Sequence, residues 1–353
     1  MRVAIVTDAW HPQVNGVVRT IDATRAELRR LGHEIEVFGP DRFGTLPCPT
    51  YPDIRLSIMP GRRLASLLSA FLPAAVHIAT EGPLGSAARG FCRRRGLPFT
   101  TAYHTRFPEY LGARFGVPVA WTYAALRRFH APATAVMVST PSVRDALAGR
   151  GFANLRPWTR GVDTSLFRPR SDPTPASEDG RPVFLYVGRL AVEKNLDAFL
   201  SLDLPGHRWV VGDGPEFERL RARYPDARFF GRRQGEALAT LYRAADVFVF
   251  PSRTDTFGLV LLEALASGLP VAAFPVPGPL DVIGDAPVGV LDHDLRAAAL
   301  RALQVEPAAC RAQAARFSWR ASAEMFLANL APYDPMPTPC GAQPPGSPAA
   351  TQA

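Results

Sequence analysis

Short apolar runs alternate with amphipathic segments along almost the whole chain. The apolar runs cover residues 2–7, 34–38, 75–79, 98–102 and 135–139, and then 182–187, 207–211, 227–230, 246–250, 270–274 and 288–291. Segments with a helical period lie between them, for example 18–31, 83–95 and 142–149. Such alternation is typical of parallel sheets covered by helices on both faces. Because it occurs twice, it predicts an α/β chain of two doubly wound units.

Changes of composition divide this pattern. Residues 168–181 are rich in proline, serine and charge, and we interpret them as a linker between a first unit, residues 1–167, and a second unit, residues 182–316. Residues 317–332 have the period of an amphipathic helix, which we expect to cross back to the first unit. Residues 333–353 have little apolar content and are predicted to be disordered.

The composition is that of a soluble globular protein, but its charge is uneven. Residues 1–165 contain 21 arginines and 11 acidic residues, a net charge of +10, whereas the remainder carries −2. A basic first unit indicates an anionic partner, such as membrane headgroups, nucleic acid or an acidic metabolite. Nucleic acid is disfavoured because no aromatic-interleaved basic motif appears. No apolar run reaches membrane-spanning length and Asp8 comes too early for a signal peptide, so we expect a cytosolic protein.

One predicted helix of the first unit combines positive charge with an apolar stripe. Arg62 and Arg63 precede five apolar residues at helical spacing, namely Leu64, Leu67, Leu68, Phe71 and Leu72. Such a helix can lie on an anionic bilayer, where each basic residue near the headgroups contributes about 1 kcal/mol. The alternative is that the stripe packs on a sheet.

Candidate binding residues are those that follow strands, because ligands of open parallel sheets bind beyond the carboxyl ends of the strands. Asn15-Gly16 allows a tight turn with positive φ, which lets backbone amides approach a ligand at the start of the next helix. An ordinary loop is the alternative. His104 follows another strand and can act as a hydrogen-bond donor, an acid or a base. A buried structural histidine is the alternative there.

The strongest constellation begins at Asp255. Asp255 or Thr256 is predicted to cap an apolar helix that ends at 267–268. Glu263 lies on the buried stripe of this helix, and a buried carboxylate requires partners. A sugar diol suits it, because a carboxylate accepts two O–H bonds; an ion pair with a core arginine is the alternative. On a helix, Asp255 and Glu263 lie about 12 Å apart, roughly the span from a nucleotide's ribose to a sugar beyond its diphosphate.

Lys194 is the only lysine of the chain, against 39 arginines. It lies with Arg189 just after the run 182–187. An ammonium and a guanidinium placed together after a strand indicate a phosphate clamp. The alternative is a lysine on a solvated helix start.

Sequence motifs for metal binding, dinucleotide binding or nucleophilic catalysis are weak or absent. Asp292-His293-Asp294 is a short match to a metal-binding signature, and Gly212-Asp213-Gly214-Pro215 has half of a dinucleotide fingerprint. The four cysteines are scattered without metal spacing. No Walker loop or nucleophile elbow appears. We therefore expect neither a bound metal nor a cofactor.

Together these residues resemble the retaining glycosyltransferases of family 4, whose GT-B fold has two facing Rossmann-like domains with an interdomain cleft. The resemblance runs from residue 1 to about 330 and is carried by HPQVNGVVRT, by GRL with EKN, and by DTFGLVLLE, which matches the family's Glu-x7-Glu motif. HIATEGPLG, TAYHTRFPEY and RGVD resemble a subgroup of bacterial GDP-mannose-dependent α-mannosyltransferases and relatives that glycosylate diacylglycerol.

The resemblance implies roles for the residues of the phosphate site. Arg189 and Lys194 would hold the donor diphosphate. Gly16 and Gly258 would offer backbone amides to it. No metal is implied, because the two cations supply the positive charge.

The resemblance also implies roles around the sugars. Glu263 would bind ribose hydroxyls, Asp255 would contact the donor sugar, and His104 would contact that sugar near the reacting carbon. Asp255 replaces the family's usual first glutamate, which leaves the identity of the sugar open. Arg62 and Arg63 would lie on the acceptor or membrane side.

The implied activity is retaining, metal-independent transfer of a hexose from a nucleotide-sugar, with mannose from GDP-mannose favoured, to a lipid or glycan acceptor. We expect a cytoplasmic enzyme that is peripheral at the inner face of the membrane, with an anionic membrane surface as a partner and no nucleic acid. One alternative is a UDP-sugar-dependent diacylglycerol glycosyltransferase, using glucose, galactose or glucuronate. More distant alternatives are a sugar-nucleotide epimerase, a phosphorylase and a non-catalytic nucleotide-binding protein. Phosphorylase is disfavoured by the short chain.

Overall fold

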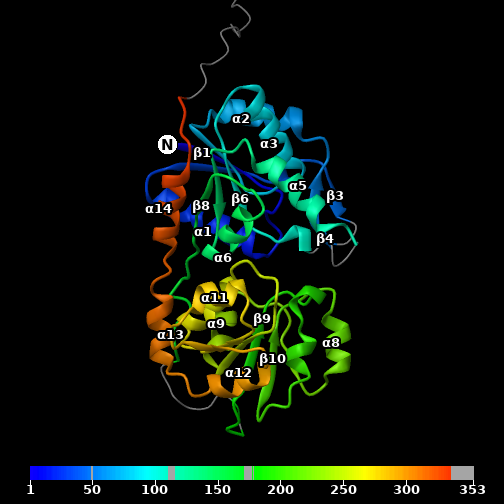
Figure 1. The fold of residues 1–353 in the computed structure, drawn as a ribbon, viewed down its shortest axis with the longest axis vertical. Coiled ribbons are helices and arrows are strands. Elements are labelled where there is room, and N and C mark those ends of the chain that lie inside the picture. The colour runs from blue at the N-terminus through cyan, green and yellow to red at the C-terminus, as the bar shows by residue number, and fades with distance from the viewer. Residues whose placement is uncertain (49–50, 110–115, 171–176, 178, 335–353) are drawn as a thin grey trace, which may run out of the picture.

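The computed structural model describes residues 1–48, 51–109, 116–170, 177 and 179–334, and they form two six-stranded sheets (Figure 1). The first sheet has the strand order β2-β1-β5-β6-β7-β8, and the second has the order β11-β10-β9-β12-β13-β14. All pairings within these two sheets are parallel. The predicted α/β fold of two doubly wound units is therefore confirmed.

The strands coincide closely with the apolar runs of the sequence. Those of the first sheet are β1 (Arg2–Val6), β2 (Glu34–Phe38), β5 (Ala75–Ile78), β6 (Thr100–Tyr103), β7 (Ala135–Val138) and β8 (Leu155–Pro157). Those of the second sheet are β9 (Val183–Val187), β10 (His207–Val211), β11 (Arg228–Phe229), β12 (Val247–Phe250), β13 (Val271–Ala273) and β14 (Gly289–Leu291). Central strands such as β9 are buried along their whole length, which explains their continuous apolar character.

Helices cover both faces of each sheet. The first unit contains α1 (Gly16–Arg30), α2 (Gly61–Phe71), α3 (Pro83–Arg94), α5 (Val119–His130) and α6 (Pro141–Ala148). The second contains α7 (Asp197–Leu200), α8 (Phe217–Arg223), α9 (Gly235–Arg243), α10 (Leu259–Ala266), α11 (Pro277–Ile283), α12 (Leu295–Ala302) and α13 (Pro307–Ala314). Along β1, Val3 and Ile5 join one apolar cluster and Ala4 and Val6 join another, because successive side chains point to opposite faces.

Several short elements were not predicted. An antiparallel hairpin, β3 (Thr45–Cys48) with β4 (Tyr51–Ser57), stands outside the parallel sheets, and the three-residue β8 forms the edge of the first sheet. Two 3₁₀ helices, η1 (Pro40–Arg42) and η2 (Val192–Lys194), follow β2 and β9. Prolines at 47 and 52 and polar residues interrupt the hairpin strands, so their sequences lack a clear apolar run.

The last helix, α14 (Trp319–Asn329), packs on the first unit although it follows the second unit in the chain. Its Phe326 is fully buried, with its ring centroid 4.9 Å from those of both His77 and Trp158. Figure 1 shows α13 beside the second unit and α14 beside the first. The domain boundaries at 167 and 182 remain predictions. Parts of the predicted linker, 171–176 and 178, and of the predicted tail, 335–353, lie outside the described residues.

The apolar stripe of α2 belongs to the core of the first unit. Leu64, Leu68 and Phe71 are buried in it, while Arg62 and Arg63 are exposed. The suggestion that this stripe could face a bilayer is therefore wrong, because the sheet and α3 already cover it. The two arginines remain available at the surface, on a helix that Figure 1 places at the end of the first unit away from the second.

Candidate functional site

Lys194 and Asp255 meet at the carboxyl ends of two neighbouring strands. β9 and β12 pair side by side, so the segments that follow them emerge at one edge of the sheet. Lys194 ends η2, and its Nζ lies 2.5 Å from Oδ1 of Asp255. The two side chains are 19% and 18% exposed. Oδ2 of Asp255 is buried and has no hydrogen-bond partner among the described residues. This edge of the sheet thus brings together two of the predicted site residues.

Arg189 lies on the same loop, directly after β9, and is half-buried. Two glycines after β10 pack against this loop. A Cβ atom on Gly212 would lie 1.8 Å from the carbonyl oxygen of Gly188, and one on Gly214 would lie 2.3 Å from that of Leu190. The half fingerprint seen in the sequence therefore serves close backbone packing that supports the loop of Arg189.

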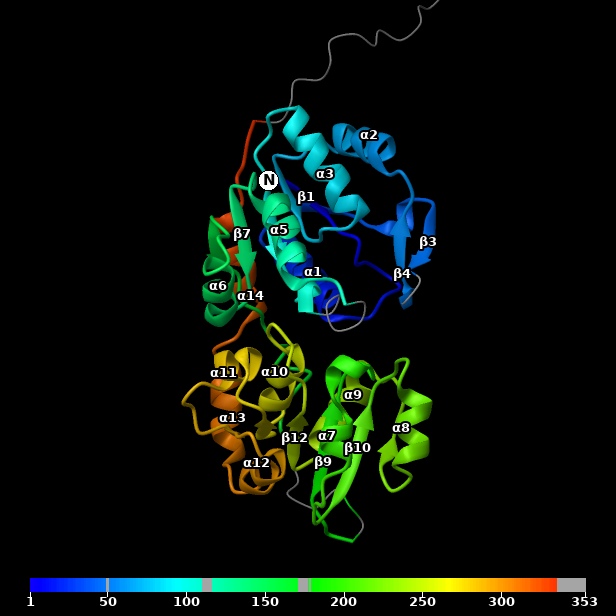
Figure 2. The same ribbon diagram turned by 45° about the vertical axis from the view of Figure 1, so that its right-hand side comes forward.

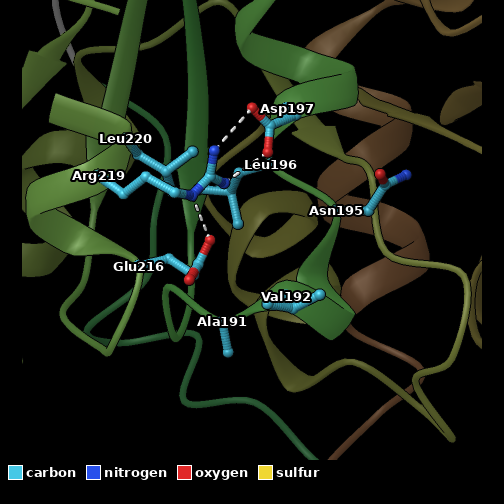
Figure 3. A pocket seen from close by; sticks show the side chains of 8 residues that line it. All are labelled: Ala191, Val192, Asn195, Leu196, Asp197, Glu216, Arg219 and Leu220. Atoms are coloured by element: carbon cyan, nitrogen blue, oxygen red, sulfur yellow. Dashed lines mark hydrogen bonds and ion pairs between the residues drawn. The ribbon is translucent and has the colours of Figure 1, made fainter. Parts of the chain in front are cut away.

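A pocket of about 160 Å³ borders the other side of this loop, and Figure 3 shows its lining. Arg219 from α8 lies between Asp197 and Glu216 and pairs with each at 2.6 Å. The two carboxylates exceed the one cation of the lining, and Arg223, which lies 3.4 Å from Asp197, supplies the second positive charge. None of the predicted site residues lines it. The network links the start of α7, which follows η2, to α8, and so braces the segment that carries Lys194.

Glu263 is buried, with 4% of its side chain exposed, and both of its oxygens have protein partners. Tyr242 donates its hydroxyl to Oε2 at 3.0 Å, and Arg19 donates to Oε1. The pKa of Arg19 is raised, chiefly by the negative charge of Glu263. The alternative, an ion pair with a core arginine, is thus confirmed in part. Glu263 does pair with an arginine, but Arg19 comes from the first unit and 41% of its side chain is exposed. The ribose role of Glu263 remains a prediction.

The start of α10 differs from its prediction. The helix begins at Leu259, and its N-cap is Gly258 in the left-handed region with φ 84° and no side-chain cap. Neither Asp255 nor Thr256 caps it, because their side chains bond Lys194 and the backbone of His104 instead. Asp255 lies outside the helix, so the helical estimate of its separation from Glu263 does not apply. The predicted end of the helix is right: it closes at Ser267, followed by Gly268 with φ 77°.

The N-termini of α1 and α10 approach each other across the two units. Gly16 is the first residue of α1, and a Cβ atom on it would lie 3.8 Å from Cδ1 of Leu259. Asn15 caps α1 by accepting from two backbone amides, with φ −151°. The predicted tight turn with positive φ at Asn15-Gly16 is therefore wrong, because the asparagine acts as an N-cap. Asn15 thus satisfies the amides of Val17 and Val18 at the start of α1.

His104 lies on this boundary after β6. Its carbonyl oxygen accepts from Oγ1 of Thr256 at 2.8 Å, and its Nδ1 lies 3.1 Å from Nη2 of Arg160. Ser139, which follows β7, donates to the carbonyl of Thr256 at 3.3 Å. The pKa of His104 is well below its usual value because of burial, and then because of the charge of Arg160. The loops after β6 and β7 thus contact the loop that carries Asp255.

Three residues of this arrangement were missed or misassigned. Arg19 lies one helical turn after Gly16, so the shared face of α1 was a usable signal. Thr256 was considered only as a helix cap, and no pattern singled out Tyr242. The contacts of Arg19 and Thr256 cross between the two units, whereas that of Tyr242 with Glu263 lies within the second unit.

Two features are absent from the part of the chain that the structure describes. No group of three or more histidine, cysteine, aspartate or glutamate side chains there could hold a metal ion. In the Asp292-His293-Asp294 segment, Asp294 caps α12. Among the same residues, no helix has the length and apolar character needed to cross a membrane.

Comparisons with known proteins point to one family. The model of "Glycosyltransferase Family 4" matches residues 14–166, and that of "Glycosyl transferases group 1" matches residues 181–305. A GDP-mannose-dependent alpha-mannosyltransferase of Mycobacterium tuberculosis is 34% identical over 84% of this chain and 86% of the relative. The sulfoquinovosyl transferase SQD2 of Arabidopsis thaliana is 33% identical over 72% of this chain and 56% of the relative. The alpha-monoglucosyldiacylglycerol synthase of Streptococcus pneumoniae is 26% identical over 87% and 79%.

Solved structures agree in fold. Sucrose-phosphate synthase from Thermosynechococcus elongatus matches with a TM-score of 0.69 at 22% identity, over 93% of this chain and 97% of that one. HepE of Anabaena in complex with UDP-glucose matches with a TM-score of 0.69 at 15% identity, over 94% and 100%. Because a relative above 30% identity spans most of the chain and two family models match its two units, the chain belongs to glycosyltransferase family 4 and has the GT-B fold.

Proposed function

We propose that this glycosyltransferase retains anomeric configuration and transfers mannose from GDP-mannose to a lipid or glycan acceptor at the cytoplasmic face of a membrane. One observation carries the proposal. Lys194 and Asp255 meet within 2.5 Å on a loop edge that is hydrogen-bonded to His104 of the opposite unit. Relatives of 34%, 33% and 30% identity bear the name GDP-mannose-dependent alpha-mannosyltransferase, which supports mannose as the transferred sugar.

The leaving group is a nucleoside diphosphate, and the site supplies positive charge for it. Negative charge develops on the diphosphate as the bond to the anomeric carbon breaks. Arg189 and Lys194 stabilise this charge, together with the amides at the starts of α1 and α10, at Gly16 and Gly258. The phosphate then replaces Asp255 as the partner of Lys194. Because these cations come from the protein, the transfer requires no metal.

The carboxylates hold the two sugars of the donor. Once Lys194 binds phosphate, the carboxylate of Asp255 accepts hydrogen bonds from hydroxyls of the transferred hexose. Glu263 accepts two ribose hydroxyls, which displaces Arg19 from Oε1. His104 orients the hexose. The acceptor attacks an oxocarbenium-like sugar on the face that the diphosphate leaves, so configuration is retained.

The names of other relatives support a second class of donor sugar. The sulfoquinovosyl transferase and the alpha-monoglucosyldiacylglycerol synthase carry other sugars in their names, and the second names a diacylglycerol product. Asp255 is one methylene shorter than the glutamate usual at its position in the family. A UDP-linked glucose, galactose or glucuronate with diacylglycerol as acceptor is therefore the second candidate.

Turnover of defined donors tests the proposal. The full chain is incubated with GDP-mannose, UDP-glucose, UDP-galactose or UDP-glucuronate, each with diacylglycerol vesicles or a soluble glycan, with and without EDTA. We expect transfer from GDP-mannose that EDTA does not reduce. An isomerised nucleotide sugar without acceptor would indicate an epimerase, and binding without turnover would indicate a non-catalytic protein.

Site variants test the residue roles in the same assay. Lys194→Ala and Glu263→Gln should each lower kcat/KM for the accepted donor at least about tenfold, the size of one charged hydrogen bond. Arg301→Ala and Glu324→Gln, whose side chains are 66% and 54% exposed, serve as controls and should leave it unchanged. If Lys194→Ala and Glu263→Gln both retain full turnover, the assignment is wrong.

A further inference from the structure

Arg160 is a buried arginine that holds the ring of His104. It is 4% exposed and follows β8 at the boundary between the units. Its Nη1 donates to the carbonyls of Trp158 and Thr159 at 2.6 and 3.1 Å, and its Nη2 lies 3.1 Å from Nδ1 of His104. The guanidinium carbon lies 4.6 Å from the ring centroid of Trp158. Four contacts therefore fix the position of the guanidinium.

The last helix of the chain fixes the segment that carries Arg160. Ser322 of α14 donates to the carbonyl of Thr159 at 2.8 Å. A Cβ atom on Gly161 would lie 2.2 Å from the backbone nitrogen of Trp319, so the chain at 161 passes directly against the start of α14. The position of Arg160 is thus set by backbone packing and does not depend on a ligand.

The bond between Arg160 and His104 determines where the imidazole carries its proton. A guanidinium has five N–H donors and no acceptor. Nδ1 of His104 must therefore be the acceptor, which leaves the proton on Nε2 and the ring neutral. Nε2 is buried and has no hydrogen-bond partner among the described residues. An N–H group left in that state costs about 1–3 kcal/mol, so this one is suited to an oxygen that a ligand brings.

The surroundings of His104 also oppose a second proton on the ring. No ion pair of Arg160 with a carboxylate occurs within the described ranges, so its charge acts on the imidazole without a counter-charge. His77 on β5 lies against the same Trp158 ring, with a centroid distance of 5.6 Å, and its Nδ1 bonds Oγ1 of Thr100 at 2.9 Å. Burial, and then Arg160, lowers the pKa of His77 to about 3, so this neighbour is neutral as well.

We propose that Arg160 is a positioning residue that fixes His104 as its neutral Nε2–H tautomer, so that His104 donates a hydrogen bond to an oxygen of the bound sugar. The proposal rests on the proposed function for the identity of that sugar, but the tautomer itself does not. It assigns His104 the role of a donor and excludes it as a general base. A hydroxyl or ring oxygen fits such a donor, whereas an ammonium group next to the guanidinium does not.

Nitrogen-15 spectroscopy of the full chain tests the tautomer directly. The chain has seven histidines, so His104→Gln identifies the signals of this ring by their loss. We expect long-range proton–nitrogen correlations typical of a protonated Nε2 and a bare Nδ1. They should not change from about pH 5 to 8, the range in which an unperturbed histidine titrates. A protonated Nδ1, or a ring that titrates in this range, would overturn the proposal.

Variants of Arg160 test its part in this arrangement. Arg160→Met keeps a long side chain over Trp158 without donors, and it should give a mixture of tautomers and a kcat for the accepted donor about tenfold lower, the size of one hydrogen bond. Arg160→Lys keeps a donor and should restore the Nε2–H pattern. Arg156→Met, at an exposed position on β8, is the matched control. An unchanged spectrum in Arg160→Met contradicts the proposal, whether or not the wild type turns over any nucleotide sugar.

Discussion

The contact between Arg19 and Glu263 joins the two units through a single ion pair. Glu263 is almost fully buried, and its charge is balanced by a residue that the second unit does not contain. Tyr242 adds a hydrogen bond but no positive charge. The stability of α10 therefore depends on the first unit.

Replacing Arg19 by methionine tests this dependence. Arg19→Met leaves a buried carboxylate without its counter-charge. It should lower the free energy of unfolding by about 1–3 kcal/mol, less than for a fully buried pair because Arg19 is partly exposed. Urea unfolding of the variant measures the loss. Arg30→Met on the same helix, with a side chain 71% exposed, should change it by less than about 0.5 kcal/mol. Equal effects of the two variants would show that the ion pair does not stabilise the fold.

At the residue scale, the sequence predicted those site residues whose chemistry is unusual where they stand. Lys194 stands out as the single lysine, and Glu263 as a carboxylate on an apolar helix. Arg19 does not stand out, because it is one of 39 arginines. Its partner, Glu263, lies on helix α10 of the other unit, so the ion pair depends on how the two units are placed.

The N-cap of helix α10 is a glycine whose backbone conformation other residues adopt only with strain. Gly258 has φ 84°, and a Cβ atom there would lie 3.1 Å from Cδ1 of Leu261 and 3.3 Å from Cζ of Phe250. The loop before it is also tightly packed, since a Cβ on Gly278 would lie 3.2 Å from the carbonyl of Asp255. The start of the helix and the position of Asp255 are therefore linked.

Gly258→Ala tests this link. The left-handed backbone alone costs about 1–2 kcal/mol for a residue with a Cβ atom, so the midpoint of thermal unfolding should fall. Donor turnover should fall with it, because the helix start moves. Gly44→Ala is the control, since Gly44 has open space around its Cβ position and no positive φ. Calorimetry and the transfer assay on both variants give the comparison, and an unaltered midpoint in Gly258→Ala would refute the strain.

At the element scale, strands buried on both faces could be predicted from the sequence because their apolar runs are continuous. The β3–β4 hairpin was not, since its strands are interrupted by prolines and polar residues. The cap of α10 was misassigned for a different reason. Asp255 and Thr256 have side chains suited to capping, but tertiary partners, Lys194 and the carbonyl of His104, occupy them.

At the scale of the whole molecule, the two units differ in net charge. The positive excess lies in the first one, and Arg62 and Arg63 are exposed at its far end, on the helix whose apolar side is buried. Any attraction of α2 to a membrane therefore rests on charge and not on an inserted apolar face. Such attraction weakens with added salt.

Arg62→Glu combined with Arg63→Glu tests the membrane proposal. Each basic residue contributes about 1 kcal/mol near anionic headgroups, so reversing both should reduce partition onto phosphatidylserine vesicles at least about tenfold. Sedimentation with vesicles of rising anionic content measures this. The matched control, Arg232→Glu with Arg233→Glu in the second unit, should leave partition unchanged. An equal loss in both double variants would show that net charge, and not α2, determines the binding.

The two parallel sheets follow from the alternating pattern, but their relative placement does not. It depends on contacts such as Ser142 with Asp281, at 2.9 Å between α6 and α11, that no local pattern encodes. Figure 2 shows these helices facing each other across the boundary.

The path of α14 has a consequence for how the protein is made. A ribosome releases the strands of the first sheet early and α14 last, with the entire second unit synthesised in between. Until α14 emerges, the surface formed by His77 and Trp158 lacks its cover. The core of the first unit thus cannot be complete before the second unit has been synthesised, and a nascent chain that stalls between them leaves this surface open to chaperones.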